Sequence, residues 1–188
     1  GHEVTHGLTT NTANLIYSYE SGALNESFSD IFGISIDMIN RPNHPNANWV
    51  LGDDLNLSIR NMANPNALGD PDTYLGNLWH TASSDNGGVH INSGVQNFWY
   101  VLLVEGGTGT NDLSNTYSVD SIGMTKASEV AFRNLTIYLT PSSQYADARF
   151  YGIQSAIDLF GACSPEVEAV TSAWYAVGVG ADYVAGVV

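Results

Sequence analysis

Gly1-His2-Glu3-Val4-Thr5-His6 opens the chain and forms an H-E-x-x-H motif, which is typical of a zinc-binding helix. Residues four positions apart lie on the same face of a helix, so both histidines can bind one metal ion. Glu3 then lies on the side where a water molecule at the metal would sit. The stretch therefore predicts a helix that carries two ligands of a catalytic zinc site.

A third ligand is expected at Glu26, in the stretch Asn25-Glu26-Ser27-Phe28-Ser29-Asp30. Catalytic zinc sites in proteins use three protein ligands and keep a fourth position open for water. A later helix that packs antiparallel to the first would bring this carboxylate to the metal. The two stretches together predict a pair of helices with a zinc ion between them.

The composition predicts one globular domain and excludes two kinds of partner. A length of 188 residues with 44% hydrophobic content suits a single core. Nineteen acidic residues against five basic ones give a net charge of −14, which repels nucleic acid and anionic membranes. No apolar run long enough to span a membrane is visible. Cys163, the single cysteine, is expected to be buried or half-buried without a catalytic role.

Apolar residues at three- and four-residue spacing predict a mainly α-helical domain. The expected helices cover residues 1–10, 22–40, 93–105, 124–138, 144–160 and 165–177. The segment 41–90 is instead rich in Asn, Asp, Gly and Pro, and we expect a long irregular loop region there. A structureless segment of that length is uncommon in a compact domain unless it has a function.

The loop region ends on a second motif, Asp85-Asn86-Gly87-Gly88-Val89-His90. Its two glycines allow a tight backbone, and a carboxylate five residues before a histidine can orient the imidazole. An Asp/His pair alone is more often a capped helix start or a hydrogen-bonded core histidine. Beside a zinc motif, the functional interpretation is favoured.

In these three blocks the chain resembles the C-terminal lobe of the thermolysin-like (gluzincin) zinc metalloendopeptidases. The blocks stand in the family's order, and the resemblance extends from Gly1 to about Gly180. It implies one helical domain over residues 1–180, with 181–188 as a tail or the start of a linker. The β-rich N-terminal lobe that precedes the zinc helix in the family is absent from the chain.

The resemblance implies a role for each residue of the three blocks. Zinc would be bound by His2, His6 and Glu26, and thermolysin itself is an established example of such a ligand set. Glu3 would act as the general base that activates water at the metal. Secretion of the protein also follows from the resemblance alone.

The resemblance implies that other residues would assist peptide hydrolysis. His90 and Tyr17 stand at family positions that donate hydrogen bonds to the oxygen that becomes negatively charged during peptide hydrolysis, and Asp85 would hold His90. Behind the ligands, Asp30 would accept a hydrogen bond from His2. Asn25 would support His6 in the same way. Such outer contacts fix the tautomer and the orientation of each ring.

Arg60 matches the family's substrate-binding arginine, although a salt-bridge hub among carboxylates is the simpler alternative. Leu51, Leu55 and Ile59 would line the apolar pocket for the residue after the cleaved bond. The resemblance thus implies peptide or protein substrates that are cleaved before bulky hydrophobic residues.

Calcium is a second metal that the resemblance raises. Asp37, Asn48 and Asp53 fall where the family's structural calcium site has acidic ligands, but one of them is an amide here. Calcium requires several oxygen ligands with sufficient negative charge. The sequence leaves calcium binding open.

Two alternatives remain beside an active zinc endopeptidase. The chain would be a catalytically incompetent zinc-binding or structural lobe if it needs an N-terminal half or a propeptide of the same precursor. Fraying of the first helical turn, where His2 lies, would weaken zinc binding in the chain alone. A chance H-E-x-x-H match is the remaining alternative, and it requires the other two blocks to coincide as well.

Overall fold

The computed structural model describes residues 1–185 and is mainly α-helical, as the sequence predicts. Short elements connect the helices: β1 (Val50–Leu51) pairs antiparallel with β2 (Arg60–Asn61), and β3 (Gly107–Thr110) pairs antiparallel with β4 (Thr116–Val119). The helices are α1 (His2–Thr10), α2 (Tyr19–Asn40), α3 (Asp85–Asn92), α4 (Gly94–Glu105), α5 (Gly123–Arg133), α6 (Tyr145–Phe160) and α7 (Pro165–Ala176).

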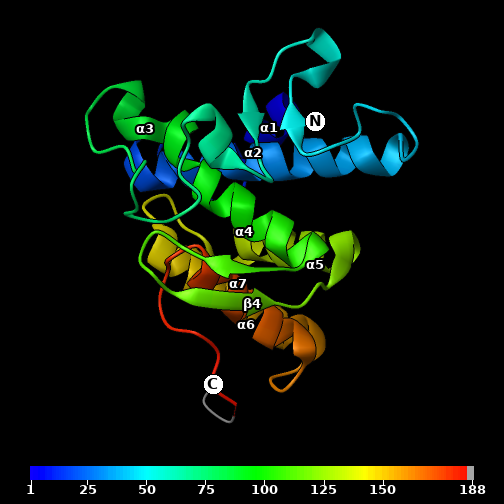
Figure 1. The fold of residues 1–188 in the computed structure, drawn as a ribbon, viewed down its shortest axis with the longest axis vertical. Coiled ribbons are helices and arrows are strands. Elements are labelled where there is room, and N and C mark those ends of the chain that lie inside the picture. Colours follow the sequence, from blue (N-terminus) through cyan, green and yellow to red (C-terminus); the bar gives the residue numbers. More distant parts are fainter. Residues whose placement is uncertain (186–188) are drawn as a thin grey trace.

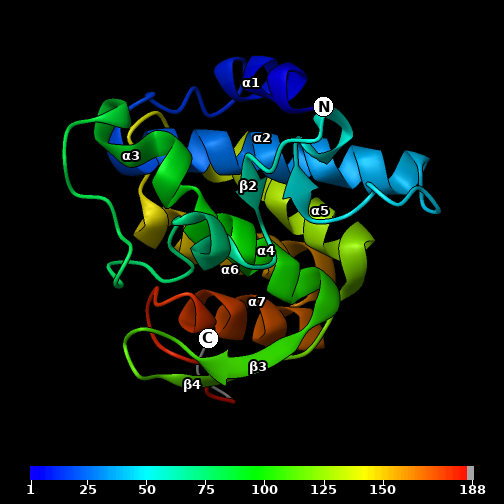
Figure 2. The same cartoon turned by 45° about the horizontal axis from the view of Figure 1, so that its top comes forward.

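The helices are stacked in layers from the N-terminus to the C-terminus. Helix α1 lies on the outer side of α2, and α2 packs against α3, α4 and α5 (Figure 1). Helices α6 and α7 pair on the other side, where the β3–β4 hairpin covers α7 (Figure 2). The two zinc-motif helices therefore lie at one end of the molecule, and α7 with the β3–β4 hairpin lies toward the other.

A hydrophobic core fills the space between α2, α4, α5, α6 and α7. Trp99 of α4 stacks on Trp174 of α7, with ring centroids 4.7 Å apart and planes inclined by 25°. Both side chains are almost completely buried. Stacked aromatic pairs stabilise a core beyond the area that they bury. The core thus gives α2 and α4, which carry site residues, a rigid support.

Two glycines allow α1 to approach α2 closely. A Cβ atom at Gly33 would lie 3.0 Å from the backbone nitrogen of His2, and one at Gly1 would lie 2.6 Å from the Cα of Gly33. Side chains at either position would push the helices apart. The sequence places glycine at the crossing point, and this fixes the distance between the two zinc-motif helices.

The structure corrects several expectations. The segment 41–90 is irregular, but it contains β1, β2 and two 3₁₀ turns, η1 (Asp53–Leu55) and η2 (Pro65–Leu68). The helix expected at 93–105 is preceded directly by α3, and the one expected at 124–138 ends in a π-helical turn, η3 (Asn134–Tyr138). Cys163 is exposed rather than buried, because it lies in the turn between α6 and α7.

The end of the chain is described in part. Residues 181–185 follow α7 without regular helix or strand, and the rest of the predicted tail, 186–188, lies outside the described residues. None of the described helices is long and apolar enough to cross a membrane.

Candidate metal centre

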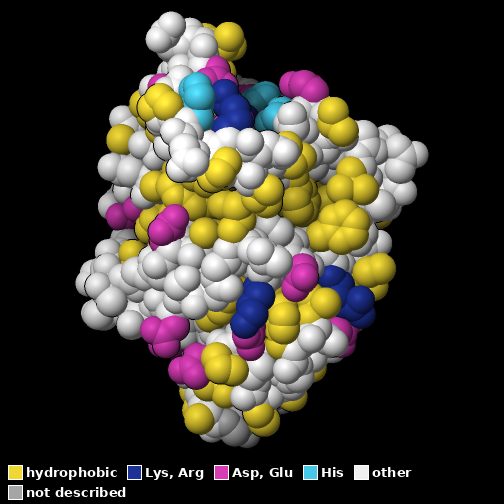
Figure 3. Space-filling view, turned by 90° about the vertical axis from the view of Figure 1, so that its right-hand side faces the viewer, with side chains coloured by type: hydrophobic (Ala, Val, Ile, Leu, Met, Phe, Trp, Pro, Cys, Tyr) yellow, Lys and Arg dark blue, Asp and Glu magenta, His cyan; other side chains and the backbone are white. Residues whose placement is uncertain are grey.

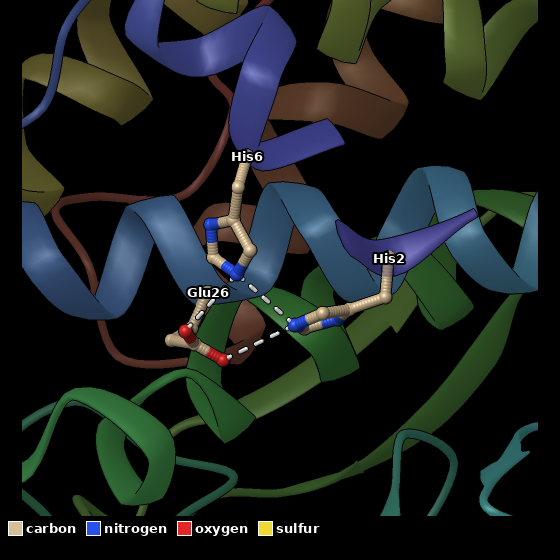
Figure 4. A group of neighbouring side chains, drawn as sticks. All are labelled: His2, His6 and Glu26. Carbon is tan, nitrogen blue, oxygen red and sulfur yellow. Dashed lines mark hydrogen bonds and ion pairs between the residues drawn. The ribbon is translucent and has the colours of Figure 1, made fainter. Parts of the chain in front are cut away.

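Helices α1 and α2 bring three side chains together, and these point toward one another (Figure 4). His2 and His6 come from one face of α1, and Glu26 comes from the middle of α2. The two Nε2 atoms lie 3.1 Å apart. Glu26 places one carboxylate oxygen 3.6 Å from Nε2 of His2 and the other 3.3 Å from Nε2 of His6. Glu26 is buried, whereas both histidines are half-buried.

The outer nitrogen of each imidazole is already engaged, and this fixes the tautomers. Asn25 donates from Nδ2 to the carbonyl of Leu15, so its Oδ1 faces Nδ1 of His6 at 2.8 Å and accepts from it. Nδ1 of His2 lies 2.8 Å from a carboxylate oxygen of Asp30. Both Nδ1 atoms therefore carry the proton, and both Nε2 atoms present a lone pair. Two unprotonated nitrogens 3.1 Å apart cannot hydrogen-bond to each other, so a metal ion, or a second proton on one of the rings, would stabilise them.

Zinc fits this arrangement of donors. Tetrahedral zinc with bonds of about 2.0–2.1 Å to nitrogen and oxygen separates its ligand atoms by about 3.3–3.4 Å. The three separations measured here, 3.1, 3.3 and 3.6 Å, lie close to that value. In the described part of the chain, these residues form the group of histidine and carboxylate side chains with metal-ligand spacing.

Asp30 organises a buried network behind the two helices. It accepts two hydrogen bonds from Arg60, at 2.7 and 2.8 Å, and one from Asn97 of α4 at 2.8 Å. Burial alone would raise the pKa of the Asp30 carboxyl, but the hydrogen bonds from His2 and Arg60 outweigh burial and lower it. Asp30 therefore stays ionised without access to water, because its partners replace the lost hydration.

The same contacts act on His2. Burial by itself lowers the pKa of its imidazole, yet the hydrogen bond to Asp30 and the nearby charges of Asp30 and Glu26 raise it overall in the metal-free protein. A site that draws a proton when no metal is bound will also attract a divalent cation, because both respond to the same negative charge.

A left-handed turn at the start of α3 positions His90. Asp85, Asn86, Gly87 and Gly88 all have positive φ, between 51° and 87°. In this turn, Asp85 accepts from the backbone nitrogen of His90 at 2.8 Å and contacts its Nδ1 at 2.6 Å. Left-handed backbone is costly for residues other than glycine. The strain is stored at the residues that aim His90 toward the zinc motif.

The two glycines are needed because aromatic rings cover the turn. A Cβ atom at Gly87 would lie 2.4–2.7 Å from the ring of Tyr19, and one at Gly88 would lie 2.8–3.0 Å from His80. His80 also contacts the hydroxyl of Ser84 through Nε2 at 2.9 Å. His80 thus supports the turn from behind, whereas His44 is exposed in the loop region.

Tyr17 connects His90 to the metal-binding group. Its hydroxyl donates a short hydrogen bond to Glu26 and lies 3.1 Å from Nε2 of His90. Burial, together with that bond and the charge of Glu26, raises the pKa of the phenol above its usual value. Tyr17 therefore remains a proton donor across the physiological pH range.

A pocket of about 540 Å³ adjoins the metal-binding group. Glu3, which is exposed, lines it together with His2 and Glu26. Figure 3 shows one face of the molecule, with histidine side chains gathered beside a basic side chain at its upper end. The apolar part of the pocket wall comes from Ile34, Val50, Leu51 and Ile59.

The predicted substrate residues are brought to this pocket with one exception. Arg60, Leu51 and Ile59 line it, and Arg60 is buried against Asp30, which is also what the salt-bridge alternative expects. Leu55 does not line the pocket and is 70% exposed, because η1 turns its side chain toward solvent.

The predicted calcium residues lie near the C-terminal end of α2. Asp37 is at that end, while Asn48 and Asp53 are close together, with a hydrogen bond of 2.9 Å from the amide to the carboxylate.

Asn97, which the sequence did not predict as a site residue, completes the Asp30 network. Its only signal was a polar pair, Gln96-Asn97, within an apolar helix.

Comparisons with known proteins agree with this geometry. Residues 13–179 match the family described as thermolysin metallopeptidase, alpha-helical domain. The chain is 44% identical to bacillolysin of Brevibacillus brevis over 184 residues and 41% identical to thermolysin of Alicyclobacillus acidocaldarius over 186 residues, in each case over 95% of this chain and 32% of the relative.

A solved structure, the precursor of protealysin, a metalloproteinase from Serratia proteamaculans, is similar over 96% of this chain and 56% of that chain, with a TM-score of 0.75 and 26% identity. The chain spans about a third of the length of the curated relatives that it matches. Helical fold, motif order and sequence identity agree, and the chain belongs to the thermolysin metallopeptidase family as its α-helical, C-terminal domain.

Proposed function

We propose that this domain supplies the zinc site and the general base of an endopeptidase that hydrolyses peptide bonds. The observation that carries the proposal is the convergence of two imidazole lone pairs and a buried carboxylate within 3.1–3.6 Å of one another. His2, His6 and Glu26 would hold the zinc ion. When bound, zinc would polarise the peptide carbonyl and acidify a water molecule.

The chain's own residues would carry the proton transfers. Glu3 accepts a proton from the attacking water and passes it to the leaving amine. Tyr17 would donate its single hydroxyl proton to the carbonyl oxygen as this becomes negative, and its hydrogen bond to Glu26 would then be given up. His90 can donate from Nε2 only when its ring is protonated, because Asp85 already takes the proton on Nδ1.

The pocket wall supports a preference for hydrophobic residues after the cleaved bond. Leu51 and Ile59 face the pocket beside Arg60. Arg60 has five N–H groups, and those not bonded to Asp30 or Glu26 are available for a substrate carbonyl. Peptides or proteins would be the substrates. An extracellular location, for which the resemblance is the support, would suit such an enzyme.

A second candidate is a lobe that binds zinc but needs further protein for activity. Val4, on the outer face of α1, is 78% exposed, and α1 packs chiefly on α2. This face of α1 is therefore free for another part of the protein to pack against. An N-terminal lobe or a propeptide of the same precursor would supply that part.

Zinc content and peptide cleavage by the 188-residue chain separate the two candidates. We expect about one tightly held zinc per chain by elemental analysis. If the domain suffices, a peptide with a bulky hydrophobic residue is cleaved, and Glu3→Gln lowers the rate by at least about 100-fold with zinc retained. Glu129→Gln, an exposed glutamate on α5, is the matched control.

The outcomes of these two measurements distinguish the candidates and test the role of Glu3. Zinc binding without Glu3-dependent cleavage favours the lobe that needs more protein. Cleavage that survives in Glu3→Gln excludes Glu3 as the general base. A chain that binds no zinc refutes the claim that α1 and α2 alone preorganise the three ligands.

A further inference from the structure

An arginine lies among the carboxylates where the family resemblance raises a calcium site. The guanidinium of Arg41, directly after α2, donates from Nε to Asp37 at 2.7 Å, and its Nη2 lies 2.5 Å from the same carboxylate. Nη2 also donates to Asp54 at 2.5 Å. We call Asp37, Arg41 and Asp54 the Arg41 cluster. Its arginine bridges the end of α2 and the turn η1.

The other oxygen atoms near the cluster are engaged as well. Asn46 donates from Nδ2 to the second oxygen of Asp54 at 3.1 Å. Asn48 donates from Nδ2 to Asp53 at 2.9 Å, while its Oδ1 accepts from the backbone nitrogen of Val50 at 2.8 Å. The side-chain oxygen of Asn48, both carboxylate oxygens of Asp54 and one oxygen each of Asp37 and Asp53 thus already have donors. Calcium would need six to eight free oxygens in one place.

The charges of the Arg41 cluster also argue against a bound calcium ion. Within residues 1–185, the zinc-motif group is the one whose histidine and carboxylate atoms are spaced to hold a metal ion. In the Arg41 cluster, a hydrogen-bond donor already stands between the two carboxylates. Hydrogen bonds from Arg41 also lower the pKa of the Asp54 carboxyl. A guanidinium that bonds two carboxylates offsets their negative charge and holds them together, as a bound divalent cation would.

We propose that Arg41 replaces a structural calcium ion in this protein. Its side chain ties the C-terminal end of α2 to η1, and so it holds the loop that carries Leu51 beside the pocket. Arg41 lines the far end of the same pocket as Glu3. The loop then keeps its position at any calcium concentration, in contrast to a site that needs the ion.

Thermal unfolding with and without calcium tests the proposal. We expect about 10 mM CaCl2 to change the Tm of the unaltered chain by less than about 1 °C relative to NaCl of equal ionic strength, since no site is free. Arg41→Asn should lower the Tm by about 1–4 °C in the absence of calcium. The same variant should then gain about 3–10 °C from CaCl2, because its freed carboxylates can bind the ion.

Arg133 provides a matched control. It bonds Asp158 at 2.7 Å, and the exposure of that pair, 34% and 23%, is similar to the 36% and 28% of Arg41 and Asp37. Arg133→Asn should lose a comparable amount of Tm and gain nothing from calcium. Arg41→Lys keeps the positive charge and should also fail to respond.

Two results would overturn the proposal. The first is a saturable rise of more than about 3 °C in the Tm of the unaltered chain with CaCl2, which would mean that Arg41 leaves a calcium site open. The second is an Arg41→Asn variant that folds and shows no response to calcium. If that variant does not fold, calorimetric titration of the unaltered chain with CaCl2 still decides: heat of binding refutes the proposal, and its absence supports it.

Discussion

Two carboxylate clusters each include residues of α2, and an arginine completes each of them in a different way. In the metal centre, Arg60 bonds mainly to Asp30 and leaves Glu26 directed at the two histidines. In the Arg41 cluster, one guanidinium bridges both carboxylates. The first arrangement leaves lone pairs that need a cation, and the second leaves none between its two acids. Whether an acidic cluster is a metal site thus depends on where its arginine points.

Burial separates the clusters as well. The Asp30 side chain is fully buried, whereas the side chains of Asp37 and Asp54 are 28% and 47% exposed. Interactions between buried charges are strong and geometrically demanding, while those between exposed charges are weak and screened by salt. Changes at the metal centre should therefore have the larger effects.

The largest effect is expected for Asp30→Asn. This change removes the charge that pairs with Arg60 and His2 inside the protein, and the loss of one partner from a buried ion pair costs about 3 kcal/mol. The Tm should fall by about 6–12 °C, and zinc affinity should fall about 10–100-fold. Chemical unfolding and zinc titration measure the two effects.

Asp158→Asn is the comparison for that experiment, because Asp158 also pairs with an arginine but at the surface. It should change stability far less and leave zinc affinity intact. Equal losses in the two variants would mean that burial does not distinguish the clusters.

A smaller effect is expected for Gly33→Ala. The added Cβ would lie 3.0 Å from the backbone nitrogen of His2, so α1 must move away from α2 and His2 from Glu26. Zinc affinity should drop by about 10-fold, with little loss of helix content by circular dichroism. The Arg41 cluster should be unaffected by Gly33→Ala, because α1 contributes no residue to it.

Gly7→Ala is the matched control on α1, since nothing lies within 4 Å of an added Cβ there. It should stabilise the helix by about 0.5–1 kcal/mol and preserve zinc affinity. If Gly33→Ala binds zinc as tightly as Gly7→Ala, the close crossing of the helices is not what sets the ligand distances.

The smallest effect concerns the pH dependence near the metal centre. Burial raises the pKa of Asp70 to about 6; Arg60 opposes this shift and Asp30 adds to it. Between pH 4 and 6, the folded protein then holds a proton that the unfolded chain has released, so stability falls as pH rises through this range. After allowance for solvent screening, the loss is about 1 kcal/mol.

Urea unfolding at several pH values measures this contribution, and Asp70→Asn should flatten the profile between pH 4 and 6 and raise stability at neutral pH. A profile that is unchanged by the substitution would assign the pH dependence to other groups.

The sequence predicts the helices well because their apolar spacing is long and regular. The helix expected at 144–160 corresponds to α6 (Tyr145–Phe160), and the one expected at 165–177 corresponds to α7 (Pro165–Ala176). The short elements had no comparable signal. Strand β3 has the sequence Gly-Thr-Gly-Thr, which lacks alternating apolar residues, and its hairpin is held by packing of β4 on α7.

The convergence of His2, His6 and Glu26 was predictable for a related reason. On a regular helix, spacing alone brings His2 and His6 to one face, and the structure brings Glu26 to that face. Residues that act through tertiary contacts were not predictable. Asn97 reaches Asp30 only because α4 crosses α2, and Arg41 reaches Asp54 only because the loop folds back. Leu55 illustrates the converse, since the resemblance implied a place at the pocket that the turn η1 does not give it.

The stacked pair of Trp99 and Trp174 gives the molecule an internal optical label. Two indoles with centroids 4.7 Å apart have coupled electronic transitions, so their near-ultraviolet circular dichroism depends on the relative orientation of α4 and α7. Neither helix contributes a residue to the proposed zinc site, which lies on α1 and α2. A signal that persists while zinc dissociates would report that α1 opens as a hinged flap, whereas a signal lost together with zinc would report that ion and core melt as one unit.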